Sequence, residues 1–208
     1  MAEPLLIVGL GGTGAPNGTT ERLLRCTLDR CEALGAETLM FDGAALDIPM
    51  YAPMVSERDA KTRAMIAGLR RANGIIIASP GYHGTVSGLI KNALDYVQDM
   101  AEDEAVYFEG RAVGLIAVAA GWQATGTTLA TLRSITHALR GWPTPMAVAV
   151  NSIQPVFDES GEPGDRGVDT QLGILAQQVV TFARMRALHE LSLKQGASER
   201  EADLAGGK

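Results

Sequence analysis

A glycine-rich stretch near the beginning of the chain is the first candidate for a ligand-binding site. It reads GLGGTGAPNGTT over residues 9–20 and follows a short apolar run. Gly9, Gly11 and Gly14 have the G-x-G-x-x-G spacing of a dinucleotide-binding turn, in which a helix starts within the glycines and meets a pyrophosphate. Here four further residues precede Thr19, where we expect the helix to begin. The longer loop, with its backbone N–H groups and hydroxyls, suits the single terminal phosphate of a mononucleotide.

Two other interpretations of this stretch stay open. A Rossmann-type enzyme would use the same glycines to bind NAD, although Asp42 lies farther from Gly14 than the roughly 20 residues typical of that motif. Glycine spacing alone is weakly specific, so the stretch could also be a strand-to-helix turn that binds nothing.

A second stretch, SPGYHGTVSGLIKNALDY over residues 79–96, has a composition suited to a planar ligand. Pro80, Gly81, Gly84 and Gly88 keep its backbone extended or turning before a helix can begin. The N–H and C=O groups of such a loop can bind the polar edge of a flat ring. The stretch therefore predicts a loop for the ring end of the ligand.

Apolar runs of strand length alternate with segments of helical period. This alternation predicts an α/β fold with a parallel sheet covered by helices on both faces. The expected strands are residues 5–10, 38–41, 74–79, 112–119 and 146–151. The expected helices are one that begins at Thr19 or Thr20 and stops at Gly35, and four others over or around residues 57–72, 89–97, 129–139 and 172–182. In a sheet of order 2-1-3-4-5, the loops after the first and third strands face each other across one crevice.

Length and composition indicate one globular domain. The chain has 208 residues, and we expect a domain over residues 1–190 followed by a flexible C-terminal tail over residues 191–208, which has few apolar anchors. A formal net charge of −6 argues against a nucleic-acid partner, which would require clustered lysine and arginine. The apolar runs end well before the roughly 18 residues of a membrane span. We therefore expect no membrane partner and a cytoplasmic location.

The sequence offers no convincing set of metal ligands. Cys26 and Cys31 point in different directions on one expected helix, which suits neither a disulfide nor a metal site. His137 and His189 lie on expected helices without companion ligands. We therefore expect no bound metal.

The second stretch also carries a resemblance to a known family. Its pattern S-P-x-Y-H-G-T-x-S-G-x-x-K-N-A-x-D-Y resembles that of the NADPH-dependent FMN reductases, and the likeness extends more loosely from the first strand to about Val150. The resemblance implies a flavodoxin-like three-layer sandwich with a five-stranded parallel sheet of order 2-1-3-4-5. It also implies an oxidoreductase that passes hydride from NAD(P)H to FMN and then electrons to an acceptor.

The resemblance and the loop composition together name the expected cofactor contacts. In the first loop these are Gly11, Thr13, Asn17, Thr19 and Thr20. In the second loop the resemblance implies Pro80, Gly81, Tyr82, His83, Gly84, Thr85 and Ser87, and in a third loop, after the fourth strand, Gly121 and Trp122. The Trp122 side chain could stack on the flavin or a nicotinamide, or pack at a subunit interface. We expect no catalytic side chain, because the flavin itself performs hydride transfer.

One departure from the family pattern affects the expected affinity for FMN. Family members commonly hold the phosphate with an arginine and a serine, and this chain has Ala15 and Gly18 at those positions. The loss of a charge-assisted hydrogen bond, worth about 1.5–3 kcal/mol, should weaken FMN binding unless Arg22 reaches the phosphate.

The resemblance further implies partners. We expect a nicotinamide dinucleotide and a small electron acceptor, which could be free flavin, a quinone, a nitro or azo compound, or an oxidised metal ion. A homodimer or a tetramer is expected, and a flavin-dependent monooxygenase is a candidate partner. Two alternatives remain: an FMN-binding electron carrier or sensor without NAD(P)H-dependent activity, and the Rossmann-type NAD-dependent enzyme.

Overall fold

Nearly continuous apolar runs form the central sheet of the protein, whose structure is a computed structural model that describes residues 4–206. The main parallel strands are β2 (Glu37–Phe41), β1 (Leu6–Gly11), β3 (Gly74–Tyr82), β5 (Ala112–Ala119) and β7 (Val148–Asn151). They lie in the order β2-β1-β3-β5, and β7 pairs with β5. Every residue of β1 and β5 is buried, as expected for a parallel sheet covered on both faces. The predicted fold class and strand order are confirmed.

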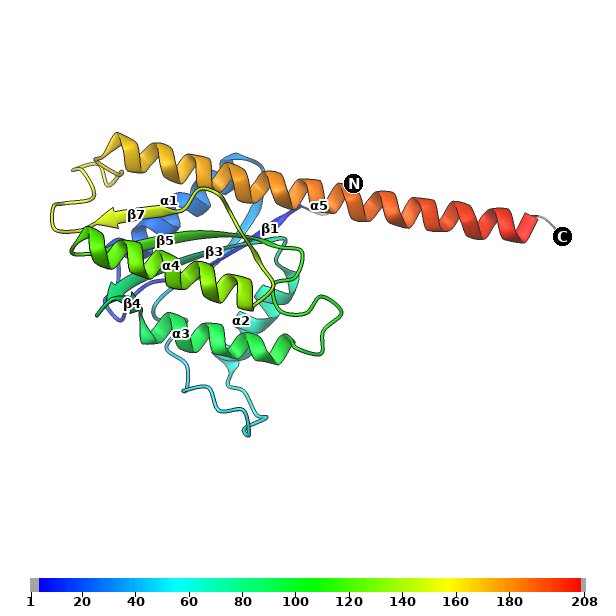
Figure 1. Ribbon diagram of the computed structural model, residues 1–208, viewed down its shortest axis with the longest axis horizontal. Helices are drawn as coiled ribbons and strands as arrows, with labels where there is room; N and C mark the ends of the chain where they lie inside the picture. The colour runs from blue at the N-terminus through cyan, green and yellow to red at the C-terminus, as the bar shows by residue number, and fades with distance from the viewer. Residues whose placement is uncertain (1–3, 207–208) are drawn as a thin grey trace.

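Helices cover the two faces of the sheet (Figure 1). The helices are α1 (Thr19–Ala33), α2 (Ala60–Arg71), α3 (Gly88–Asp95), α4 (Trp122–Ala138) and α5 (Arg166–Gly206), with a short 3-10 helix, η1 (Tyr96–Met100), after α3. Successive strand residues point to opposite faces, so Ile7 belongs to the core under α1 and α5, and Val8 to the core under α2, α3 and α4.

The strand expected at residues 146–151 begins later, at Val148, and a separate short strand precedes it. A short strand, β6 (Trp142–Pro143), pairs with β5 before the chain leaves the sheet, and pairing resumes only at β7. Pro143 and Pro145 have no N–H to donate to a ladder, and the Thr144 hydroxyl donates to the Met146 carbonyl at 2.7 Å. The edge of the sheet is therefore built from two separate segments.

The third strand is longer than its apolar run predicts. β3 extends beyond Ser79 to Tyr82, because β4 (Thr85–Val86) folds back on it as an antiparallel hairpin. The two turn residues, His83 and Gly84, have φ values of 51° and 88°, as in the primed turns typical of two-residue hairpins. The expected irregular loop is therefore a hairpin that precedes α3.

The last helix continues well past the sheet (Figure 1). A tail was expected from residue 191, yet residues 191–206 are helical, which agrees with their content of Leu, Lys, Gln, Ala, Glu and Arg. Leu191 and Leu193 are exposed, in line with the expected lack of apolar anchors. The domain boundary at residue 190 and the flexibility of the tail stay predictions, and residues 207–208 lie outside the described residues. Across the described part of the chain, none of the helices is both long and apolar enough to cross a membrane.

Candidate functional site

Three loops lie next to one another at the carboxyl edge of the sheet. They follow β1, β3 and β5, which are neighbours in the strand order. This edge is where open α/β sheets bind their ligands. The structure places every expected cofactor contact in or beside these loops: Gly11, Thr13, Asn17, Thr19 and Thr20 from the last residue of β1 to the first turn of α1; Pro80, Gly81, Tyr82, His83, Gly84, Thr85 and Ser87 from the end of β3 to the N-cap of α3; and Gly121 and Trp122 at the beginning of α4.

The glycine fingerprint serves packing more than ligand binding. Gly9 and Gly11 lie within β1, where a Cβ atom at Gly11 would come within 2.7 Å of Leu24 Cδ2 and 2.9 Å of Ala78 Cβ. These glycines therefore let α1 and β3 approach β1 closely. The helix begins only at Thr19, as expected, so the geometry differs from that of a Rossmann turn.

The loop between β1 and α1 offers neutral donors at a helix start. The Thr13 hydroxyl accepts a hydrogen bond from the Ala15 N–H at 3.0 Å and so stabilises a tight turn. Gly18 is the N-cap residue, and none of the described side chains caps α1 there. Backbone N–H groups in the first turn of a helix are left without helical partners and attract anions. The loop therefore fits a phosphate group through its backbone.

Sequence reasoning missed a contact that holds this loop. The turn after β2 brings Gly43 against Thr13, and a Cβ atom at Gly43 would lie only 1.9 Å from the Thr13 carbonyl oxygen. The turn itself is ordered by Asp42, whose carboxylate accepts from the Ala45 N–H at 2.9 Å. One sequence signal was available. Gly43 follows the second expected strand, so its turn leaves the sheet at the same edge as the β1–α1 loop. Gly43 therefore positions the loop that we expect to hold a phosphate.

Arg22 does not point into this loop. Its Nη2 donates to the Gly161 carbonyl at 3.2 Å, and its guanidinium carbon lies 3.7 Å from the centre of the Phe157 ring. These contacts bind the β7–α5 connection to α1. The arginine that could have replaced the missing family arginine is therefore used for packing.

The hairpin between β3 and α3 presents an open backbone surface. Tyr82, His83, Gly84 and Thr85 are all exposed at its tip. A Cβ atom at Gly84 would meet no heavy atom of the described residues within 4 Å. The hairpin can therefore accept a planar ring against its main chain without displacing side chains.

Ser87 holds the base of this hairpin. Its side chain is 3% exposed, and its hydroxyl caps α3 by accepting from the Ile90 N–H at 3.2 Å. Its own N–H donates to the buried Ser79 hydroxyl oxygen at 3.1 Å. The geometry therefore supports a structural role for Ser87, whereas its expected proximity to a cofactor stays a prediction.

We expect Ser87→Ala to lower the free energy of unfolding by about 1 kcal/mol, because an N-cap hydrogen bond is lost. The flavin dissociation constant should change by less than about threefold, since the backbone of the hairpin is retained. Denaturant unfolding and flavin titration measure the two effects, with Ser134→Ala on the exposed face of α4 as the control. A large loss of flavin affinity at unchanged stability would instead make Ser87 a direct contact.

The third loop combines an open glycine with an exposed tryptophan. Gly121 is the N-cap of α4, and its Cβ position is open within 4 Å among the described residues. Trp122 is 67% exposed and borders a cavity of about 340 Å³ together with Asn151 and Ile153. Trp122 therefore faces the end of β7 as well as this loop, and its expected stacking on a ligand stays a prediction.

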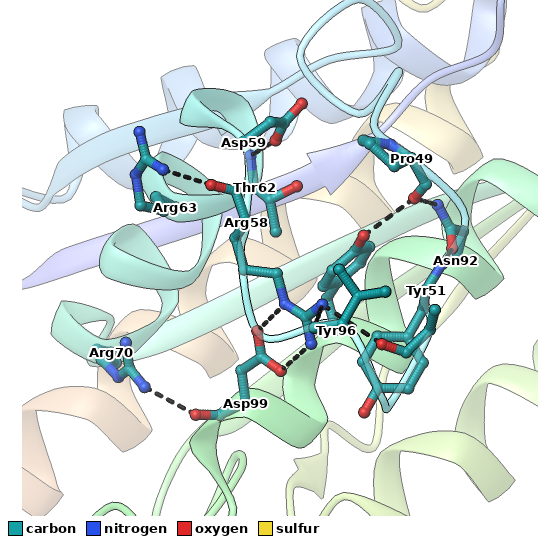
Figure 2. A network of polar contacts seen from close by, with 12 residues as sticks. Pro49, Tyr51, Arg58, Asp59, Thr62, Arg63, Arg70, Asn92, Tyr96 and Asp99 are labelled. Carbon is teal, nitrogen blue, oxygen red and sulfur yellow. Dashed lines mark hydrogen bonds and ion pairs between the residues drawn. The ribbon is translucent and has the colours of Figure 1, made fainter.

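A long loop, the β2–α2 loop (residues 42–59), projects from the same region of the sheet and is held by an ion pair (Figure 2). Arg58 Nε and Nη2 donate to the two Asp99 carboxylate oxygens at 2.8 and 2.9 Å. The guanidinium carbon lies 5.3 Å from the Tyr51 ring centre and 5.0 Å from that of Tyr96. Bidentate pairs of this kind, with both side chains mostly shielded from water, restrain the backbone that carries them.

The Asn92 amide adds a second restraint to the β2–α2 loop (Figure 2). Its oxygen accepts from the Tyr51 N–H at 2.8 Å, and its nitrogen donates to the Pro49 carbonyl at 2.9 Å. The loop nevertheless presents apolar side chains to solvent, with Met50 78% and Met54 94% exposed. Polar contacts therefore hold the conformation of the β2–α2 loop, because the apolar side chains at its tip are not buried.

The two thiols are unsuited to nucleophilic chemistry. Burial raises the pKa of the Cys31 thiol to about 12, and burial followed by the nearby Glu162 carboxylate raises the pKa of Cys26. Both thiols are protonated at neutral pH, and the thiolate is the reactive form. Within the described residues, no group of three or more metal-ligating side chains comes together.

Comparisons with known proteins agree on one family. The sequence model of the NADPH-dependent FMN reductases matches residues 5–154. The FMN-dependent NADPH-azoreductase of Staphylococcus aureus is 28% identical over 183 residues, which cover 82% of this chain and 91% of that protein.

Solved structures agree with the fold. The flavoenzyme NAD(P)H:acceptor oxidoreductase from Paracoccus denitrificans superimposes with a TM-score of 0.71 at 14% identity, covering 88% of this chain and 99% of that one. An NADH:FMN oxidoreductase in its apo form superimposes with a TM-score of 0.66 at 20% identity, covering 85% and 89% of the two chains. At these identities the likeness concerns the fold alone.

Proposed function

Because this chain belongs to the NADPH-dependent FMN reductase family, we propose that it binds FMN across the three loops and reduces it with NAD(P)H. The supporting observation is the space left at the carboxyl edge of the sheet. Gly14, Gly84 and Gly121 each come from a different loop, and a Cβ atom at any of them would meet no described heavy atom within 4 Å. Three loops that all leave room for a ligand are suited to a cofactor that spans them.

Each loop has a separate part in this proposal. The β1–α1 loop would hold the phosphate through backbone N–H groups, and Thr19 and Thr20 would add hydroxyls at the beginning of α1. The hairpin at Tyr82 to Thr85 would hold the ring edge, and Gly121 would let the third loop approach its other side. FMN, when bound, supplies the two-electron redox chemistry, so the protein needs no acid or base of its own. His83 would contribute shape and hydrogen bonding at the hairpin turn.

Anaerobic reduction tests the proposal. The purified protein is mixed with FMN and then with NADPH or NADH while the flavin absorption band is followed. Bleaching that depends on the protein supports the reductase. Flavin binding without bleaching would support an electron carrier or sensor instead, and stoichiometric NAD binding without flavin would support a Rossmann-type enzyme.

The proposed acceptor is a small oxidised compound. The relative from Staphylococcus aureus is named an azoreductase, so azo compounds are the first class to test, followed by quinones and free flavin. An open flavin face needs few specific contacts with such acceptors, and steady-state rates with each class will rank them. If free flavin is preferred, a flavin-dependent monooxygenase is the expected recipient of the reduced product.

We also propose a homodimer or tetramer that works in the cytoplasm. Met50, Met54 and Val55 lie exposed on the restrained β2–α2 loop, and clustered apolar surface of this kind is usually covered by a partner. Size-exclusion chromatography with light scattering measures the assembly. Cys26 and Cys31 are free thiols among the described residues, which suits a reducing compartment that also contains NAD(P)H.

A further inference from the structure

The carboxyl edge of the sheet lacks the positive charge that a phosphate site usually has. No lysine or arginine occurs in the first loop (residues 9–20), in the hairpin and its flanks (residues 79–90), or in the third loop together with the first turns of α4 (residues 119–132). The nearest arginine along the chain, Arg22, is engaged with Phe157 and Gly161. The next arginine, Arg25, is paired with Glu21 at 3.4 Å. Any phosphate at this edge would therefore be held by neutral donors and by the partial charge of a helix end.

A buried carboxylate stands at the same helix end. Glu21 lies in the first turn of α1 and is 6% exposed. One of its oxygens accepts from the Asn17 N–H at 3.3 Å, so it uses a backbone donor of the very loop that would bind the phosphate. The other oxygen lies 3.4 Å from Arg25 Nη2, which directs that cation toward Glu21. Glu21 therefore places negative charge beside the phosphate position and occupies one of its donors.

Asp42 adds a second acid beside the loop. Its carboxylate accepts from the Ala45 N–H at 2.9 Å, and the next residue, Gly43, packs against Thr13 of the loop. A phosphate monoester carries a charge of about −1.5 to −2 at neutral pH. The attraction of the helix end and the repulsion by these acids act in opposite directions on such a group.

We propose that this protein selects its flavin by the ring and ribityl chain and hardly by the phosphate, so that riboflavin is bound nearly as well as FMN. The inference rests on the proposed flavin site and deepens it by naming the ligand class as flavins with or without a phosphate. Glu21 is the residue that limits the preference for FMN. A flavin bound in this way exchanges with free flavin. It therefore serves as a substrate as well as a cofactor.

Flavin fluorescence titrations test this inference without any measurement of activity. The protein is titrated against FMN and against riboflavin at low and at moderate salt. We expect the two dissociation constants to lie within about tenfold of each other, because no cation distinguishes the two ligands. The constant for FMN should also depend only weakly on salt.

Two variants separate the contributions of charge. Glu21→Gln keeps an acceptor for the Asn17 N–H and removes the charge, so FMN should bind about three- to tenfold more tightly while riboflavin is unchanged. Ala15→Arg places a cation at an exposed position of the loop and should tighten FMN binding at least about tenfold, again without an effect on riboflavin. Asp29→Asn on the exposed side of α1 removes the same net charge far from the loop and should alter neither constant.

The outcomes discriminate between the two proposals. A preference of wild-type protein for FMN of more than about a hundredfold, or a Glu21→Gln variant that affects both flavins equally, would overturn this inference while the flavin site stands. Failure of both flavins to bind would overturn the proposed function, and this inference with it. Unfolding curves of each variant show whether a change in affinity reflects a damaged fold.

Discussion

Gly43→Ala is expected to weaken FMN binding by about three- to tenfold. The added Cβ atom would lie 1.9 Å from the Thr13 carbonyl oxygen, which is far inside van der Waals contact. The neighbour is backbone, so the β1–α1 loop itself must move away from the turn after β2. Because that loop is expected to hold the phosphate end, its displacement separates the donors from the ligand. Flavin fluorescence titration measures the loss.

A variant at a second glycine, Gly68→Ala, is the control for the general loss of stability that an overpacked Cβ atom causes. Gly68 lies on α2, and a Cβ atom there would come within 2.9 Å of the Phe41 ring, away from the β1–α1 loop. Gly68→Ala should lower stability by about 1–3 kcal/mol and leave the flavin dissociation constant nearly unchanged. Equal losses of affinity in the two variants would show that Gly43 acts through global stability and not by positioning the loop.

Gly84→Val is expected to reduce flavin affinity by at least about tenfold while the fold is retained. The new side chain would project into open space at the hairpin tip, where nothing described lies within 4 Å of the Cβ position. That space is the proposed place of the flavin ring. The φ of 88° at this position is also unfavourable for a β-branched residue, which adds strain of about 1–2 kcal/mol.

The strain and the obstruction can be separated with Gly161. It has almost the same φ, 89°, but lies in the β7–α5 connection near Arg22. Gly161→Val should therefore reproduce the backbone strain without blocking the proposed ring position. Unfolding curves of the two variants should be similar, whereas only Gly84→Val should impair flavin binding. An unchanged flavin affinity in Gly84→Val would remove the hairpin from the site.

The sequence predicts best those features that depend on residues close together along the chain. The continuous apolar run of residues 112–119 predicted β5 with its observed bounds, because a strand buried on both faces needs no polar alternation. The beginning of α1 at Thr19 was predicted equally well from the loop that precedes it. The family follows from the short pattern over residues 79–96, and its match over residues 5–154 confirms that prediction.

The predictions failed where a distant segment competes with local preference. β3 was expected to end at Ser79, but pairing with β4 extends it to Tyr82. The strand expected to begin at residue 146 begins at Val148, because the Met146 N–H donates to the distant Gln178 side-chain oxygen at 2.9 Å. Arg22 illustrates the same limit for a side chain, because its partner Gly161 is separated from it by 139 residues.

Short-range sequence patterns were sufficient to predict the α/β class and the loops in which a phosphorylated ring compound would be sought, and the family resemblance added the strand order. Periodicity and turn-forming residues act over a few neighbouring positions, so they can be recognised without coordinates. Three features became visible only in the folded chain: Gly43 packs on Thr13, Arg22 turns away from the loop, and Glu21 is buried at the helix start. These contacts depend on how the sheet and helices bring separate segments together, and they set the charge and shape that a ligand would meet.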